Sequence, residues 1–172
     1  MSLESNVMYR EAVSKDAEAI VTFYNRVGGE TTYLSFEKDE YPLDTAAQTG
    51  CIENTFTKPH CIMILALVND KVVGIGTIMS EDKIKSRHIG GLGIVIEKEH
   101  QGQGIGSEIM RRLIEFCRTN GITTKIKLDT RTDNEKAVAL YRRLGFEIEG
   151  QLKNDALVNG TYYDIYVMGM IL

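Results

Sequence analysis

The 172-residue sequence is poor in proline and cysteine, and it has no tryptophan. Its three cysteines are an odd number and none forms a Cys-x-x-Cys pair, which argues against a disulfide framework and against a zinc ribbon. With two prolines and no repeated or low-complexity segment, the chain offers no candidate linker. We therefore expect one globular domain in a reducing compartment, that is, a cytoplasmic protein.

The sequence also lacks the marks of secreted, membrane-spanning and nucleic-acid-binding proteins. Residues 1–6 carry neither the cationic start nor the apolar run of a signal peptide, and we expect them to be a short leader before a domain over residues 7–172. No uninterrupted apolar stretch is long enough to span a bilayer. The formal net charge of −4 argues against a clustered basic surface for DNA or RNA.

Metal and hydrolase chemistry find equally little support. The three histidines are scattered, and neither His-Glu-x-x-His nor Gly-x-Ser-x-Gly occurs. Cys117 falls on the apolar stripe of an expected helix, which favours a core position over a nucleophile. The sequence therefore predicts neither a bound metal nor a serine or cysteine nucleophile.

Strand-like and helix-like patterns alternate along the chain. Apolar and β-branched runs predict strands over residues 7–10, 61–68, 72–79, 92–96, 125–129 and from 161 to the C-terminus. Apolar stripes at helical spacing predict helices over residues 14–28, 44–56, 105–120 and 134–144, with Ser14, Asp44 and either Asp133 or Asn134 as N-caps. Asn69-Asp70 and Asn159-Gly160 predict hairpin turns. The pattern indicates one mixed α/β unit.

The most informative segment is the glycine-rich run from Gln101 to Ser107, which lies between an expected strand and an amphipathic helix. The first amides of a helix have no partner within the helix and lie at the positive end of its dipole, so this turn can hold a pyrophosphate. A Rossmann fingerprint fails because Ser107 stands where Gly or Ala is required, and a P-loop fails because the lysine is missing. The alternative is an ordinary turn that contains glycines.

This segment reads Q-x-x-G-x-G, and it resembles the acyl-CoA loop of the GNAT superfamily of N-acetyltransferases. Residues 134–146 resemble the family's downstream N-x-x-A-x-x-L-Y-x-x-x-G-F block. The likeness in pattern covers most of the chain, although the N-terminal half carries no sharp motif and His100 departs from the residues that often precede the loop. The resemblance implies a GNAT-type α/β fold, a single domain with a mixed, largely antiparallel sheet flanked by helices.

The resemblance also implies that acetyl-CoA is the cosubstrate, and it indicates which residues bind it. Backbone groups of Ile94, Val95 and Ile96 would hydrogen-bond the pantetheine arm in the manner of an added strand, and Asn134 would contact the same arm. The pyrophosphate loop would comprise Gln101, Gly102, Gln103, Gly104, Ile105, Gly106 and Ser107. Bulky side chains at 94–96 are equally expected of a buried strand, so composition does not separate these roles.

Acetyl transfer to an amine leaves a thiolate that needs a proton. A tyrosine with a pKa of about 10 can protonate a thiolate with a pKa of about 8.5 at a modest mismatch. Tyr141 is the general-acid candidate, at the position that the resemblance implies. Asn134 and Tyr141 are one heptad apart and share one face of the expected helix, with the small Ala137 between them. In the structural alternative, Tyr141 is a core aromatic and Asn134 is a helix cap.

A general base is useful as well, because an amine with a pKa of about 10.4 is mostly charged at pH 7. Asp129, at a strand end where some GNAT members have a carboxylate base, is one candidate; the alternative is a solvated carboxylate that balances Lys125 and Lys127. Glu30 is the second candidate, because the loop over residues 28–44 can fold over the acceptor site.

The same loop bears on the acceptor. Its carboxylates and its aromatics Tyr33, Phe36 and Tyr41 suit a cationic amine, although such a loop can also be a connection pinned by its aromatics. We expect direct transfer to a primary amine of a small cationic metabolite of polyamine type or of a peptide. The alternative is a non-catalytic acyl-CoA-binding regulatory module. The resemblance is compatible with a homodimer.

Overall fold

The computed structural model describes residues 6–172, so the leader expected over residues 1–6 lies outside the described part except for Asn6. The strands are β1 (Met8–Glu11), β2 (Ile62–Val68), β3 (Lys71–Met79), β4 (Ile89–Ile96), β5 (Lys125–Arg131), β6 (Glu147–Val158) and β7 (Thr161–Ile171). The helices are α1 (Ala17–Val27), α2 (Thr45–Phe56), α3 (Ile105–Thr119) and α4 (Glu135–Leu144), with short 3₁₀ turns η1 (Ser14–Asp16) and η2 (Lys98–His100).

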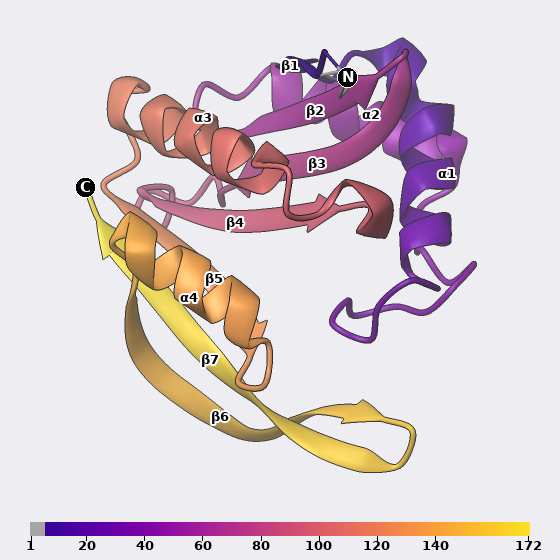
Figure 1. Ribbon diagram of the computed structural model, residues 1–172. Coiled ribbons are helices and arrows are strands. Elements are labelled where there is room, and N and C mark those ends of the chain that lie inside the picture. Colours follow the sequence, from indigo (N-terminus) through magenta and orange to yellow (C-terminus); the bar gives the residue numbers. More distant parts are fainter. Residues whose placement is uncertain (1–5) are drawn as a thin grey trace.

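Within the described residues the strands form one sheet of seven strands, in the order β1-β2-β3-β4-β5-β7-β6 (Figure 1). Neighbouring strands are antiparallel except β4 and β5, which run parallel and are connected through α3. The expected α/β fold with a mixed, largely antiparallel sheet flanked by helices is therefore confirmed.

Local sequence signals explain several element boundaries. Asp44 caps α2, since its Oδ1 accepts a hydrogen bond from the Ala47 N–H at 2.8 Å. Asn69 and Asp70 adopt φ angles of 49° and 62°, which is the conformation of a two-residue hairpin turn. Asn159 and Gly160, at 48° and 77°, form the equivalent turn between β6 and β7. The predicted cap and both hairpins are confirmed.

Two boundaries differ from the prediction. Ser14 is not the N-cap of the first helix: the carboxylate of Asp16 accepts from the Val13 N–H at 2.8 Å, a 3₁₀ turn follows, and α1 begins only at Ala17. Strand β4 begins at Ile89 rather than at residue 92. Glycines have low strand propensity, so the run around Gly90 and Gly91 concealed the first part of this strand.

Helices cover the sheet on both faces (Figure 1). One apolar cluster lies between the sheet and α3, with α4 packed at its margin, and a second cluster lies between the sheet and the pair α1 and α2. Cys117 is fully buried in the first cluster, and burial raises the pKa of its thiol to about 11, as expected of a core residue. No helix among residues 6–172 has the length and apolarity that crossing a bilayer demands.

The position of α3 follows from glycines on β3. A Cβ at Gly76 would collide with Ile109, and a Cβ at Gly74 would lie 2.8 Å from Ile96. The missing side chains let α3 approach the sheet closely. Because β4 and β5 are parallel, their carboxyl ends and the N-termini of α3 and α4 meet at one end of the molecule, which is where ligands of α/β sheets bind.

Candidate active site

The sheet opens between β4 and β5. These strands pair only at Ile89 with Lys125, Gly90 with Ile126, and Gly91 with Lys127, and they diverge towards their carboxyl ends (Figure 1). From Leu92 onwards β4 has a partner only on its β3 side. A strand edge of this kind exposes backbone donors and acceptors that an extended ligand can pair with.

The register with β3 decides which backbone groups face this open edge. Glu97 N–H donates to the Val73 carbonyl at 2.9 Å, and hydrogen-bonded pairs alternate along an antiparallel ladder. The backbone of Val95 is therefore directed at β3, whereas that of Ile94 and Ile96 is directed at the open edge. Gln101 already occupies the Ile96 carbonyl, to which its Nε2 donates at 3.1 Å. Of the three expected strand residues, Ile94 and Ile96 thus keep free backbone groups.

The glycine loop presents a row of unpaired amides. Within residues 6–172, none of the backbone N–H groups of residues 102–107 donates to another protein group. Gly102 and Gly104 have φ angles of 75° and 82°, in the left-handed region that favours glycine, and Gly104 stands at the N-cap of α3 without a capping side chain. Unpaired amides at the positive end of a helix dipole fit the pyrophosphate of coenzyme A.

The loop and the open strand lie side by side. A Cβ at Gly106 would lie 3.7 Å from Cγ1 of Ile96 and 4.0 Å from Cδ1 of Ile94, so the first turn of α3 stands over the end of β4. Ile105 is buried and anchors this turn in the core. The two segments expected to contact different parts of one cosubstrate are therefore adjacent.

A buried carboxylate that the sequence analysis missed supports the base of the loop. Glu97 forms ion pairs with Lys71 at 2.7 Å and Arg26 at 3.1 Å, and its Oε2 lies 3.0 Å from Nδ1 of His100. Burial raises the pKa of Glu97, but the hydrogen bond from Lys71 and the charges of Arg26 and His100 outweigh burial and lower it below the usual value. The unusual His100 thus has a structural partner within the chain.

Tyr141 lies on α4, and Asn134 stands at the N-cap of this helix but does not cap it with its side chain. The side chain of Asn134 makes no hydrogen bond within the described part of the chain, so it is available to a ligand. Tyr141 is 8% exposed and packs edge-on against Phe146. Burial raises the pKa of Tyr141 to about 12, so its hydroxyl keeps its proton at neutral pH.

The two candidate bases differ in their contacts. Asp129 is exposed on β5 and has no hydrogen-bond or ion-pair partner among residues 6–172. Glu30 is partly occupied, since its Oε2 accepts from the Lys98 N–H at 2.9 Å. This bond ties the loop after α1 to the segment that leads into the glycine loop. Asp129 is therefore the less constrained of the two carboxylates.

Arg131, at the end of β5, joins three segments and was also missed by the sequence analysis. Its guanidinium donates to Asp133 at 2.6 and 2.9 Å and to the Thr32 carbonyl at 2.9 Å. It also lies over the rings of Tyr33 and Tyr163, at 4.7 and 3.8 Å from their centroids. Because Arg131 is only 6% exposed, it fixes the loop after α1 and the β6–β7 hairpin against the end of β5.

The loop aromatics divide between two roles. Tyr41 stacks on Tyr24 with centroids 4.5 Å apart, and Phe36 packs edge-on against both rings. These two aromatics pin the loop. Tyr33 is 45% exposed and belongs instead to the Arg131 contacts.

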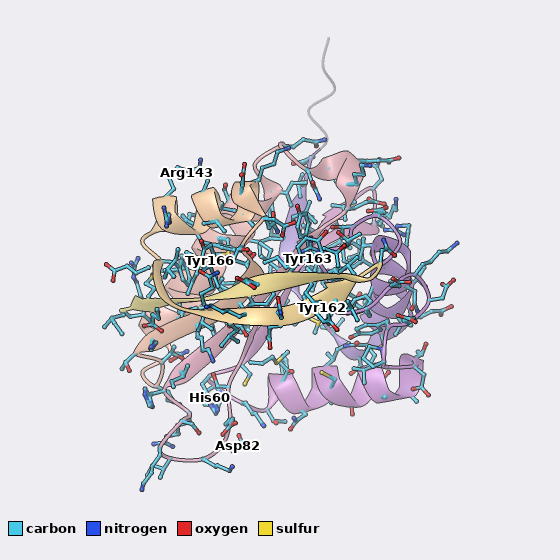
Figure 2. All side chains as sticks on the ribbon, turned by 90° about the horizontal axis from the view of Figure 1, so that it is seen from below. His60, Asp82, Arg143, Tyr162, Tyr163 and Tyr166 are labelled. Atoms are coloured by element: carbon cyan, nitrogen blue, oxygen red, sulfur yellow. The ribbon has the colours of Figure 1, made fainter. Side chains whose placement is uncertain are left out.

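A groove borders this part of the molecule. It has a volume of about 870 Å³ and runs between the loop at residues 28–40 and the hairpin residues Leu157 and Val158. Figure 2 shows Tyr162 and Tyr163 on opposite sides of this hairpin. Of the two, Tyr163 is the one whose ring contacts Arg131. The lining of the groove includes Thr32 and Tyr33, which contact Arg131 at the end of β5.

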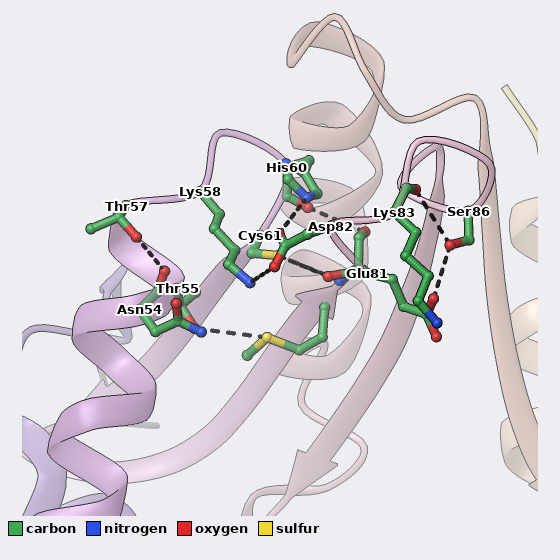
Figure 3. Close-up of polar contacts among 12 residues, drawn as sticks. Asn54, Thr55, Thr57, Lys58, His60, Cys61, Glu81, Asp82, Lys83 and Ser86 are labelled. Atoms are coloured by element: carbon green, nitrogen blue, oxygen red, sulfur yellow. Dashed lines mark hydrogen bonds and ion pairs between the residues drawn. The ribbon is translucent and has the colours of Figure 1, made fainter.

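A second polar cluster lies away from this site. Lys58 pairs with Asp82 at 2.8 Å, and the Nε2 of the buried His60 is 3.8 Å from the same carboxylate (Figures 2 and 3). Ser80 N–H donates to the Cys61 Sγ at 3.4 Å. These contacts connect the turn before β2 to the loop after β3. None of them involves a residue at the split between β4 and β5.

Comparison with known proteins agrees with this geometry. Residues 22–146 match the sequence model of the acetyltransferase (GNAT) family. The chain is 30% identical to L-amino acid N-acetyltransferase AaaT of Escherichia coli K12, over 97% of this chain and 99% of that protein. It is 34% identical to an acetyltransferase of the GNAT family from Streptococcus pneumoniae, covering 97% and 99% of the two chains with a TM-score of 0.94.

A more distant structure shares the fold. A GNAT superfamily phosphinothricin acetyltransferase from Sinorhizobium meliloti, crystallised with acetyl-CoA, is 21% identical, with 96% of this chain and 88% of that one covered and a TM-score of 0.84.

Proposed function

This chain belongs to the acetyltransferase (GNAT) family, and we propose that it transfers the acetyl group of acetyl-CoA to the primary amine of an L-amino acid. The observation that carries the cosubstrate is the row of unpaired amides at residues 102–107 beside the open edge of β4. The acceptor class is supported by AaaT, which matches this chain over nearly its whole length. That relative moves our preference from a polyamine or a peptide to an amino acid.

Bound acetyl-CoA supplies a thioester whose carbonyl carbon the amine attacks. The free amides of residues 102–107 hold the pyrophosphate, and the open backbone of Ile94 and Ile96 aligns the extended arm beside β4. The side chain of Asn134, which has no hydrogen-bond partner within residues 6–172, fixes the same arm from the N-terminus of α4. These contacts place the thioester where the two strands diverge.

Tyr141 stabilises the departing sulfur. With a pKa of about 12, its hydroxyl is a poorer proton donor than a free tyrosine, so a hydrogen bond donated to the thiolate contributes more than complete proton transfer. Asp129 removes a proton from the ammonium group of the acceptor, directly or through a water molecule, and the neutral amine then attacks the thioester. We assign this role to Asp129 because Glu30 already accepts a hydrogen bond from the Lys98 N–H.

A thiol-release assay with acetyl-CoA tests the function. The acceptor panel contains L-amino acids, spermidine and short peptides, and calorimetry measures acetyl-CoA binding separately. We expect acetyl-CoA to bind without acceptor and thiol release to require an L-amino acid. Release with spermidine or peptides alone would overturn the acceptor class. Binding without release for any acceptor would favour the non-catalytic module, and no binding would overturn the whole proposal.

Matched variants distinguish between the two candidate bases, Asp129 and Glu30. We expect Asp129→Asn to lower kcat and to flatten the rise of kcat with pH, whereas Glu30→Gln keeps that pH profile. The reverse result would assign the base to Glu30.

A further inference from the structure

One face of β5 carries charged side chains beside bare backbone. Burial alternates along this strand, so Lys125, Lys127 and Asp129 lie on the face opposite the α3 cluster. Lys125 pairs with Glu149 at 2.8 Å. Within residues 6–172, Lys127 has no carboxylate within ion-pair distance and Asp129 has no ion pair either. An unpaired cation and an unpaired anion are thus neighbours on one face.

Glycines on β4 leave space beside Lys127, whereas the carboxyl group of Glu149 fills the place of a side chain at Gly169 on β7. Lys127 pairs with Gly91 of β4 on one side and with Gly169 of β7 on the other. Gly93 continues the bare surface along β4 and is exposed. Since paired residues point to the same face of a sheet, the space beside Lys127 is open on the β4 side, towards Gly91 and Gly93.

This open space is outside the cover of α1 and α2. The apolar cluster under these helices contains residues of β2 and β3 and reaches β4 only at Val95. Lys127 itself is exposed. A small ligand that reaches the split between β4 and β5 can therefore contact Lys127 and Asp129 together.

The spacing of the two charges matches a zwitterion. Residues two apart on a strand are separated by roughly 7 Å between Cα atoms, and lysine has a long flexible side chain. An ammonium held at Asp129 leaves the carboxylate of the same α-amino acid within reach of Lys127. A polyamine has only positive charges, and its second amine would be repelled by Lys127.

Other cations of this face are already occupied. Lys125 is neutralised by Glu149, whose carboxyl group lies over Gly169. Arg131 is engaged by Asp133 and Thr32. β5 lies wholly within the described residues. Of its cations, only Lys127 makes no ion pair and remains free for an anionic group.

We infer that Lys127 binds the carboxylate of the amino-acid acceptor and thereby determines specificity for amino acids over amines without a carboxylate. This inference rests on the proposed function, because it concerns the acceptor of the same reaction. It adds a residue and a physical reason to the acceptor class.

The test compares paired acceptors. One is an L-amino acid that the wild-type enzyme acetylates, and the other is the primary amine that lacks its carboxylate but is otherwise the same. We expect Lys127→Met to raise KM for the amino acid about tenfold or more, as the loss of a hydrogen bond to a charged group does, and to change KM for the amine less than twofold. Lys127→Arg should restore most of the loss.

Two controls locate the effect. Lys85→Met changes an exposed lysine in the loop between β3 and β4 and should leave both KM values unchanged. Lys127→Glu should lower KM for spermidine, because it exchanges repulsion for attraction. KM for acetyl-CoA should stay within twofold in every variant.

The outcomes distinguish this inference from the proposed function. Suppose that the wild-type enzyme acetylates amino acids but that Lys127→Met raises KM equally for both acceptors, or for neither. Lys127 then does not bind the carboxylate, whereas the proposed amino-acid N-acetyltransferase function stands. If the wild-type enzyme uses no carboxylate-bearing acceptor, the proposed acceptor class fails first, and the inference fails with it.

Discussion

The two sides of the split between β4 and β5 are constructed differently. The side to which we assign coenzyme A consists of β4, the loop over residues 101–107 and α3, and it presents backbone amides that the protein leaves unpaired. The side to which we assign the acceptor is held by side chains, with Arg131 joining Thr32, Asp133 and Tyr163. Backbone recognition tolerates sequence change, whereas recognition by side chains changes with each substitution. One cosubstrate can thus serve many acceptors on this fold.

The difference predicts where single substitutions act. On the coenzyme side they should change KM for acetyl-CoA, and on the acceptor side KM for the amine. A residue that serves the reaction between the two sides should instead change kcat.

Tyr141 should give the largest effect. We expect Tyr141→Phe to lower kcat about a hundredfold, the lower end of what a positioned proton donor contributes, with both KM values within threefold. The hydroxyl makes no hydrogen bond within residues 6–172, so the thermal midpoint should hardly move. Thiol release and calorimetry on the same sample measure these quantities. A full rate in the variant would remove Tyr141 from the mechanism.

The glycine loop should give the next effect, and the chain offers a matched control. Gly104 and Gly121 flank α3 with φ angles of 82° and 76°, and neither has an atom within 4 Å of an added Cβ. Valine at either position imposes a similar backbone strain and should lower the thermal midpoint similarly. Only Gly104→Val should also raise KM for acetyl-CoA, by about tenfold or more, because it redirects the amides of the loop. Equal KM values in the two variants would contradict the pyrophosphate assignment.

The same division explains what the sequence could and could not predict. Helix caps, hairpin turns and the glycine loop depend on residues close together in the chain, and Asp44, Asn69 and Gly104 carry these signals in their own identity. Arg131 depends on Thr32, which lies 99 positions away, and the bond from Lys98 to Glu30 spans 68 positions. No local pattern encodes such pairs.

Strand register is a second reason why the sequence could not predict every residue of the site. Val95 was expected to offer its backbone to the cosubstrate, but the register with β3 directs that backbone to Ile75. Register is a property of two strands together, so a single strand pattern cannot supply it. The role proposed for Lys127 could not be predicted for the same reason, because the glycine beside it lies on β4, far away in the sequence.

A variant of Arg131 sharpens the comparison on the acceptor side. Arg131→Met should release the loop after α1 and raise KM for the acceptor about fivefold, while KM for acetyl-CoA changes less than twofold. Arg131 is buried, but its partner Asp133 is half-exposed and stays solvated when the guanidinium is removed. The free energy of unfolding should therefore fall by about 2 kcal/mol, less than after the loss of one partner of a fully buried ion pair. Steady-state kinetics with each substrate varied in turn measures the effect. Equal increases in both KM values would mean that Arg131 supports the two sides alike.

The smallest effect should appear at acid pH, through the partner of the same arginine. The hydrogen bond from Arg131 lowers the pKa of Asp133 below its usual value. A carboxylate with a lowered folded-state pKa stabilises the fold fully above its unfolded pKa of about 3.9 and loses that contribution as pH falls through the folded value. The free energy of unfolding of Asp133→Asn should thus be lower than that of the wild type by no more than about 1 kcal/mol from neutral pH to about pH 4, since the carboxylate is 41% exposed. Below pH 4 the two curves should converge in urea titrations.

Asp155→Asn, at an exposed position without an ion pair among residues 6–172, should follow the wild type throughout. A difference that grows towards acid pH would reverse the sign of this linkage and show that Asp133 strains the end of β5.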